Sequence, residues 1–139
     1  MTAMTAENSL SQVQSTAEAI RNDEPQRFSE AASVGDVARQ GDIYLEKLAG
    51  VPDGCTLEEK PLSQLAPGTT QGSRHIIDSL EGVTVYRLSN PTELDGPILD
   101  LATERTITHP EHGNLILPPG VYGVTYQRAF ADELRRVAD

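Results

Sequence analysis

The chain has 139 residues, with 21 acidic against 11 basic side chains, a formal net charge of -10 and four Tyr and two Phe as its aromatic residues. This length supports one domain. The negative charge argues against direct nucleic-acid binding, which depends on Lys and Arg displacing counterions from phosphates. No apolar window is long enough for a membrane helix, and the N-terminus lacks a secretory signal pattern, so we expect a soluble protein. A single cysteine, Cys55, excludes an internal disulfide.

The first part of the chain is polar. Residues 1–38 contain six acidic side chains against Arg21 and Arg27, with few large apolar groups. Such a segment cannot bury much of itself, so we expect an acidic N-terminal arm at 1–38 followed by a body at 39–139. Apolar residues at helical spacing within the arm predict a short helix that needs a surface to lie against. The residues that we expect to anchor the arm on a partner are Leu10, Val13, Ile20 and Phe28.

From Arg39 onward the hydrophobic period changes from helical to two, and clusters of glycine and proline separate short apolar runs. About eight short strands, spaced by roughly 8 to 12 residues, are typical of an all-β sandwich or barrel with antiparallel pairing. The predicted strands are 43–48, 56–60, 74–78, 83–88, 98–101, 105–108, 114–117 and 121–128. A small jelly roll or cupin-like barrel is the favoured topology, and an immunoglobulin-like sandwich is the alternative.

The end of the chain returns to helical spacing. Phe130, Leu134 and Val137 follow one another at i, i+4 and i+7, which predicts a short C-terminal helix folded back on the body.

The three histidines are the first candidates for a chemical site. His109 and His112 lie three residues apart on a predicted loop, and His75 lies near the start of another predicted strand. Together with Glu111 as a fourth ligand, they would suit a zinc or non-haem iron site of the cupin kind. The other interpretation is structural: His109 caps the end of a strand and His112 is solvated in a turn.

Three strings in the body are the most distinctive in the sequence: 40–45 (QGDIYL), 71–75 (QGSRH) and 117–122 (LPPGVY). They look like strings in phage and bacterial proteins of no assigned family. An acidic β body with a long N-terminal arm resembles the capsid cement, or decoration, proteins of tailed bacteriophages. This resemblance implies a trimer or dimer on the exterior of a virion, whose arm clamps the major capsid protein or other assembly subunits.

Three hypotheses therefore remain open. The leading one is a non-enzymatic structural protein of an assembly, without a cofactor. The second is a cupin-like metal-binding protein or enzyme that uses His75, His109 and His112. The third is a cytoplasmic β binding module whose arm folds over its own sheet.

Overall fold

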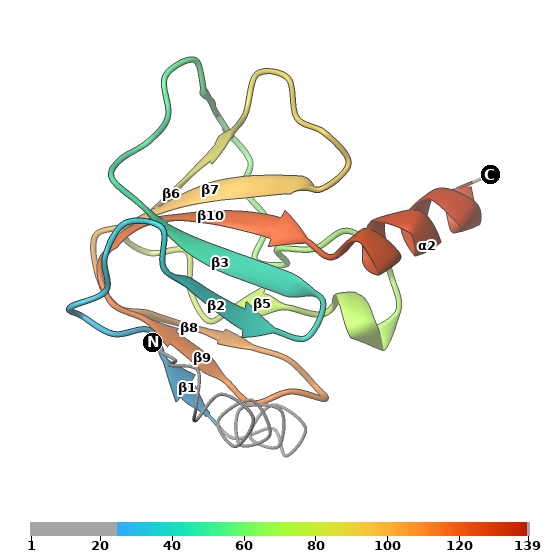
Figure 1. Ribbon diagram of the computed structural model, residues 1–139, viewed down its shortest axis with the longest axis horizontal. Coiled ribbons are helices and arrows are strands. Elements are labelled where there is room, and N and C mark those ends of the chain that lie inside the picture. Colours follow the sequence, from blue (N-terminus) through green and yellow to red (C-terminus); the bar gives the residue numbers. More distant parts are fainter. Residues whose placement is uncertain (1–24, 139) are drawn as a thin grey trace, which may run out of the picture.

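The computed structural model describes residues 25–138, which form a sandwich of two β-sheets and one C-terminal helix (Figure 1). The strands are β1 (Gln26–Arg27), β2 (Val37–Gln40), β3 (Ile43–Leu48), β4 (Thr56–Leu57), β5 (Ile76–Ile77), β6 (Val83–Arg87), β7 (Asp95–Leu101), β8 (Arg105–Thr108), β9 (Leu115–Leu117) and β10 (Gly120–Tyr126). A short 3-10 turn, η1 (Gln71–Ser73), precedes β5, and the helix α2 (Arg128–Ala138) ends the described part of the chain.

The smaller sheet has the order β1-β9-β8-β5, and the larger one has the order β2-β3-β10-β7-β6-β4. Within 25–138 every pairing between these strands is antiparallel except that of β1 with β9, which is parallel. The expected mainly β sandwich with a short C-terminal helix is thus confirmed. No helix in the described residues is long and apolar enough to cross a membrane.

The core lies between the two sheets. Alternate residues of β3 point inward, so Ile43 and Leu45 are fully buried, as the period of two predicted. Tyr122 of β10 is also fully buried, and its hydroxyl donates to the carbonyl of Pro118 at 2.8 Å, which satisfies the one polar atom of its ring. The remaining core members are Phe28, Leu65, Ala66, Val85, Leu99, Leu101, Ile107, Leu115, Leu117, Val124 and Phe130.

The segment before Arg39 contributes to both sheets. Strand β1 pairs with β9, β2 pairs with β3, and the expected boundary between residues 38 and 39 falls inside β2. Phe28, which we expected to contact a partner, is 5% exposed and packs edge-to-face on Tyr122 at 5.3 Å between ring centroids. The other three expected anchors, Leu10, Val13 and Ile20, lie outside the described residues.

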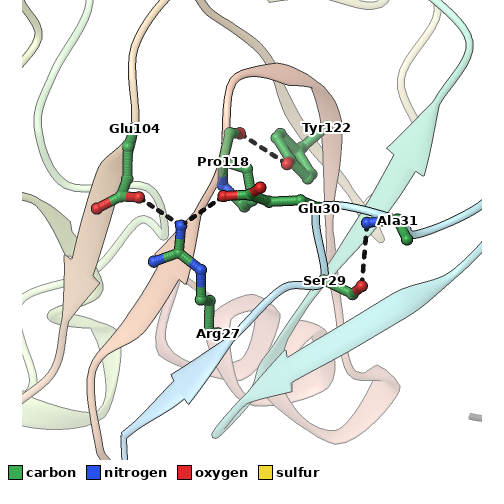
Figure 2. Close-up of polar contacts among 7 residues, drawn as sticks. All are labelled: Arg27, Ser29, Glu30, Ala31, Glu104, Pro118 and Tyr122. Carbon is green, nitrogen blue, oxygen red and sulfur yellow. Dashed lines mark hydrogen bonds and ion pairs between the residues drawn. The ribbon is translucent and has the colours of Figure 1, made fainter.

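Polar contacts attach this segment to the body at the surface (Figure 2). The Arg27 guanidinium contacts Glu104, in the connection before β8, at 2.6 Å and Glu30 at 3.0 Å. All three side chains are exposed, so these ion pairs contribute little to the free energy of folding. The strand pairings and the burial of Phe28 therefore attach the segment more firmly than these ion pairs do.

Replacing Phe28 by Ala is therefore expected to lower the free energy of unfolding by about 3–5 kcal/mol, because it removes a buried aromatic ring and leaves a cavity. Urea unfolding followed by circular dichroism measures this change. Val34→Ala is the matched control in the same segment, because Val34 is 62% exposed, and we expect a change within about 0.5 kcal/mol. An unchanged midpoint for Phe28→Ala would contradict the packing of this segment on the body.

Candidate functional site: a histidine cluster

The three histidines meet at one end of the sandwich. The ring centroids of His75 and His109 are 4.3 Å apart, and those of His109 and His112 are 4.7 Å apart. We call these three side chains the histidine cluster. His75 is fully buried, His109 is 8% exposed and His112 is half-buried.

Sheet register explains why His75 reaches the other two. In the antiparallel pairing of β5 with β8, Ile76 is opposite Thr108 and Ile77 is opposite Ile107. One further step of this register places His75 opposite His109. His112 follows in the loop between β8 and β9. The turn between β2 and β3, the β8–β9 loop and η1 all lie at this end of the molecule (Figure 1).

Gln40, at the end of β2, determines the tautomer of His75. The Gln40 amide nitrogen donates to the carbonyls of Ile107 at 3.0 Å and Gly113 at 2.9 Å, so its Oε1 is the atom that faces His75. Oε1 can only accept, and therefore the His75 Nδ1 that lies 2.8 Å from it carries a proton and donates. In a neutral ring Nε2 then has only a lone pair. His75 Nε2 is buried and has no hydrogen-bond partner among residues 25–138.

His109 is held differently. Its Nδ1 accepts from the backbone N–H of Glu111 at 3.0 Å, so the proton of the neutral ring is on Nε2, which donates to the carbonyl of Gly72 in η1 at 3.1 Å. The possible metal-ligand atoms of His109, Glu111 and His112 all lie within 4.8 Å of one another. The cluster therefore combines imidazole nitrogens with one exposed carboxylate.

Gly41 leaves room for the histidine rings because it has no side chain. It occupies the two-residue turn between β2 and β3 with a φ of +56°, a conformation that favours glycine in hairpin turns. A Cβ atom at Gly41 would lie 2.5 Å from Cδ2 and 2.6 Å from Nε2 of His112, and 3.4 Å from Cε1 of His75. The absence of a side chain here allows two of the rings to pack against the turn.

Burial keeps the His75 ring neutral. Loss of hydration is the largest cause that lowers the pKa of His75, and the nearby His109 and His112 lower it further. The backbone of Gly72 raises it, and the resulting pKa is about 3. A neutral imidazole with a lone pair is the form that binds a metal ion.

A pocket of about 560 Å³ lies beside the cluster. Gly72, whose carbonyl accepts from His109, and the neighbouring Ser73 form one wall, and Asp42, Phe130 and Glu133 lie around it. Gly72 therefore contacts both the pocket and the His109 ring.

Sequence reasoning singled out all three histidines and Glu111, and the structure brings them together. It missed the roles of Gln40, Gly41 and Gly72. A glycine inside a run with strand periodicity was the available signal at Gly41, since it marks a turn or a close approach. Gln40 begins the distinctive string 40–45, but nothing in that string indicates its hydrogen bonds to the loop and to His75.

A family model described as "Domain of unknown function (DUF8820)" matches residues 39–127. The chain belongs to this family. No curated protein and no solved structure matches the chain. The DUF8820 match begins one residue before Gln40 and ends after β10, so the whole histidine cluster and the Gln40–Gly41 turn lie within it.

A methyl group at Gly41 should disturb the DUF8820 histidine cluster. Gly41→Ala is expected to lower the free energy of unfolding through backbone strain of about 1–3 kcal/mol and a further 1–3 kcal/mol or so from overlap with His112. Gly35→Ala is the matched control: Gly35 also has a positive φ, +97°, but its Cβ would meet nothing within 4 Å. A loss for Gly41→Ala no larger than backbone strain alone, about 1–3 kcal/mol by urea unfolding, would contradict the packing of His112 against Gly41.

The lowered pKa of His75 predicts a pH dependence of stability in metal-free protein. The unfolded state takes up a proton near pH 6.5, whereas the folded state resists it until about pH 3. His75 therefore stabilises the fold above pH 6.5, and this contribution declines as the pH falls from 6.5 towards 3, by up to about 1.4 kcal/mol per pH unit. Urea unfolding at several pH values should give a shallower decline for His75→Asn. The same slope in both proteins would contradict the burial of His75.

Proposed function

We propose that the protein binds a divalent first-row transition-metal ion, with Zn²⁺ as the reference, through the histidine cluster. The single observation that carries this proposal is the buried lone pair of His75 Nε2 beside two further imidazoles. A buried polar atom without a partner costs free energy, and a metal ion is one partner that would satisfy it.

The donor set fits such an ion. Imidazole nitrogens suit Zn²⁺, Cu²⁺, Fe²⁺ and Ni²⁺, and a carboxylate such as that of Glu111 is an accepted fourth ligand of Zn²⁺. His75 also has the hydrogen bond expected of a ligand, because its other ring nitrogen donates to an oxygen acceptor on Gln40.

Binding requires a rearrangement that also brings His75 Nε2 to the ion, because the group of ligand atoms that already lie near one another comprises His109, Glu111 and His112. Ligand atoms of tetrahedral Zn²⁺ lie about 3.3 Å apart, given Zn–N bonds of about 2.0 Å. The donor atoms of His109, Glu111 and His112 are within 4.8 Å of one another and would need to close on the ion. His109 would also exchange one of its two hydrogen bonds, to Gly72 or to Glu111, for the metal.

Titration with Zn²⁺ tests this proposal on protein purified without a histidine tag and freed of metal by a chelator. We expect one ion per chain and a rise in Tm, because an ion that binds only the folded state stabilises it by about 2.7 kcal/mol at 100 times its Kd. His75→Asn should abolish the rise, since Asn can still donate to Gln40 but has no atom in place of Nε2. His112→Asn is the second variant.

Glu59→Gln is the control for ions that bind the acidic surface. Glu59 is exposed and outside the cluster, so its replacement should leave the Zn²⁺ response unchanged. No change in Tm for the unaltered protein with Zn²⁺, Fe²⁺ or Mn²⁺ would overturn the proposal, and so would a full response in folded His75→Asn.

The role in a phage capsid stays a prediction from resemblance, as do an assembled trimer or dimer, a virion location and the lack of enzymatic activity. Metal binding is preferred here because it follows from contacts within the described residues, whereas three of the four residues of the expected clamp lie before Pro25 and the fourth, Phe28, is buried. The two proposals are compatible, since the cluster is at one end of the sandwich and β1, which belongs to the expected arm, is at the edge of the smaller sheet.

A further inference from the structure

We infer that Gln40 is the positioning residue of the histidine cluster: its single carboxamide fixes both which nitrogen His75 presents and the span of the loop that carries His109 and His112. This inference concerns the same site as the proposed metal binding and rests on it for its functional meaning. The tautomer that it assigns to His75 can be measured without any metal.

The first part of the role of Gln40 is to determine which nitrogen of His75 can bind a metal ion. Gln40 is 1% exposed, so its carboxamide must find its partners within the protein. With its amide nitrogen committed to two carbonyls, only an acceptor is left for His75, and the ring must place its proton on Nδ1. Nε2 is therefore unprotonated in the metal-free protein, and its lone pair is available to bind a metal ion.

The second part of the role of Gln40 is to hold the loop that carries His109 and His112. The two carbonyls that accept from Gln40 belong to Ile107 and Gly113, at the two ends of the segment that contains His109 and His112. One amide group, reaching from the larger sheet to the smaller one, thus holds both ends of this segment at a fixed separation. Gln40 thus contacts the His75 ring directly and acts on His109 and His112 only through the two ends of their loop.

An apolar side chain of similar size can neither accept from His75 nor donate to the loop carbonyls. Gln40→Leu removes the acceptor from His75 and the donor from both loop carbonyls. The ring is then free to carry its proton on Nε2, which would block that atom for a metal. Loss of such a partner typically weakens metal binding about 10- to 100-fold. Gln40→Glu restores an acceptor for Nδ1–H but no donor for the loop.

Long-range ¹H–¹⁵N NMR of the histidine rings in metal-free protein at pH 7 reads the tautomer directly. We expect His75 to carry its proton on Nδ1 in the unaltered protein and in Gln40→Glu, and to shift towards the Nε2–H form in Gln40→Leu. Zn²⁺ should bind Gln40→Leu at least about 10-fold more weakly than the unaltered protein. His75 as Nε2–H in the unaltered protein would overturn the inference, whether or not either variant folds.

Gln64→Leu is the matched control. The Gln64 amide also donates to two backbone carbonyls, those of Ala66 at 2.7 Å and Gly68 at 2.9 Å, but its side chain has no hydrogen bond to a histidine. The same tautomer shift or loss of Zn²⁺ affinity in this control would assign the effect to general destabilisation and overturn the inference. If the unaltered protein binds no metal but His75 is the Nδ1–H tautomer, the metal proposal fails and the orienting role of Gln40 stands.

Discussion

The buried hydrogen bonds of Gln40 are the interaction on which the histidine cluster depends. A carboxamide has one acceptor and one donor group, and here the two have distinct roles, because the donor group joins two loop carbonyls and the acceptor faces His75. A buried polar network stabilises a site only when its members are satisfied. In this network His75 Nε2 has no hydrogen-bond partner within the part of the chain that the structure describes, and its lone pair makes His75 a candidate ligand.

The geometry of the β2–β3 turn places Gln40 where its side chain can reach both His75 and the β8–β9 loop. Gly41 turns the chain from β2 into β3 within two residues, and its lack of a Cβ lets the rings of His75 and His112 lie against the turn. The hairpin belongs to the larger sheet and His75 and His109 flank strands of the smaller one, so the cluster is built across the gap between the sheets. The histidine cluster therefore depends on the fold at this end, because a change that separates the sheets also separates the histidines.

Much of the sandwich could be predicted from sequence, because its longer strands are half-buried and follow a period of two. β8 (Arg105–Thr108) has the predicted bounds. β1 and β2 could not be found in this way. β1 is two polar residues long, and its partner β9 is far away in the sequence. The polar composition of 1–38 therefore suggested one arm, although Phe28 within it is held in the core by a contact with Tyr122.

The sequence predicted which residues form the candidate site, but not the contacts that bring them together. The spacing of His109 and His112 made them neighbours on any loop, whereas the approach of His75 required the β5–β8 register. Gln40 has no motif, since its role comes from where a hairpin ends. The most direct test of the central claim is the X-ray absorption spectrum of the protein loaded with one Zn²⁺ per chain. Scattering from three imidazole rings at about 2.0 Å is the expected result, and an ion bound by oxygen ligands alone would contradict it.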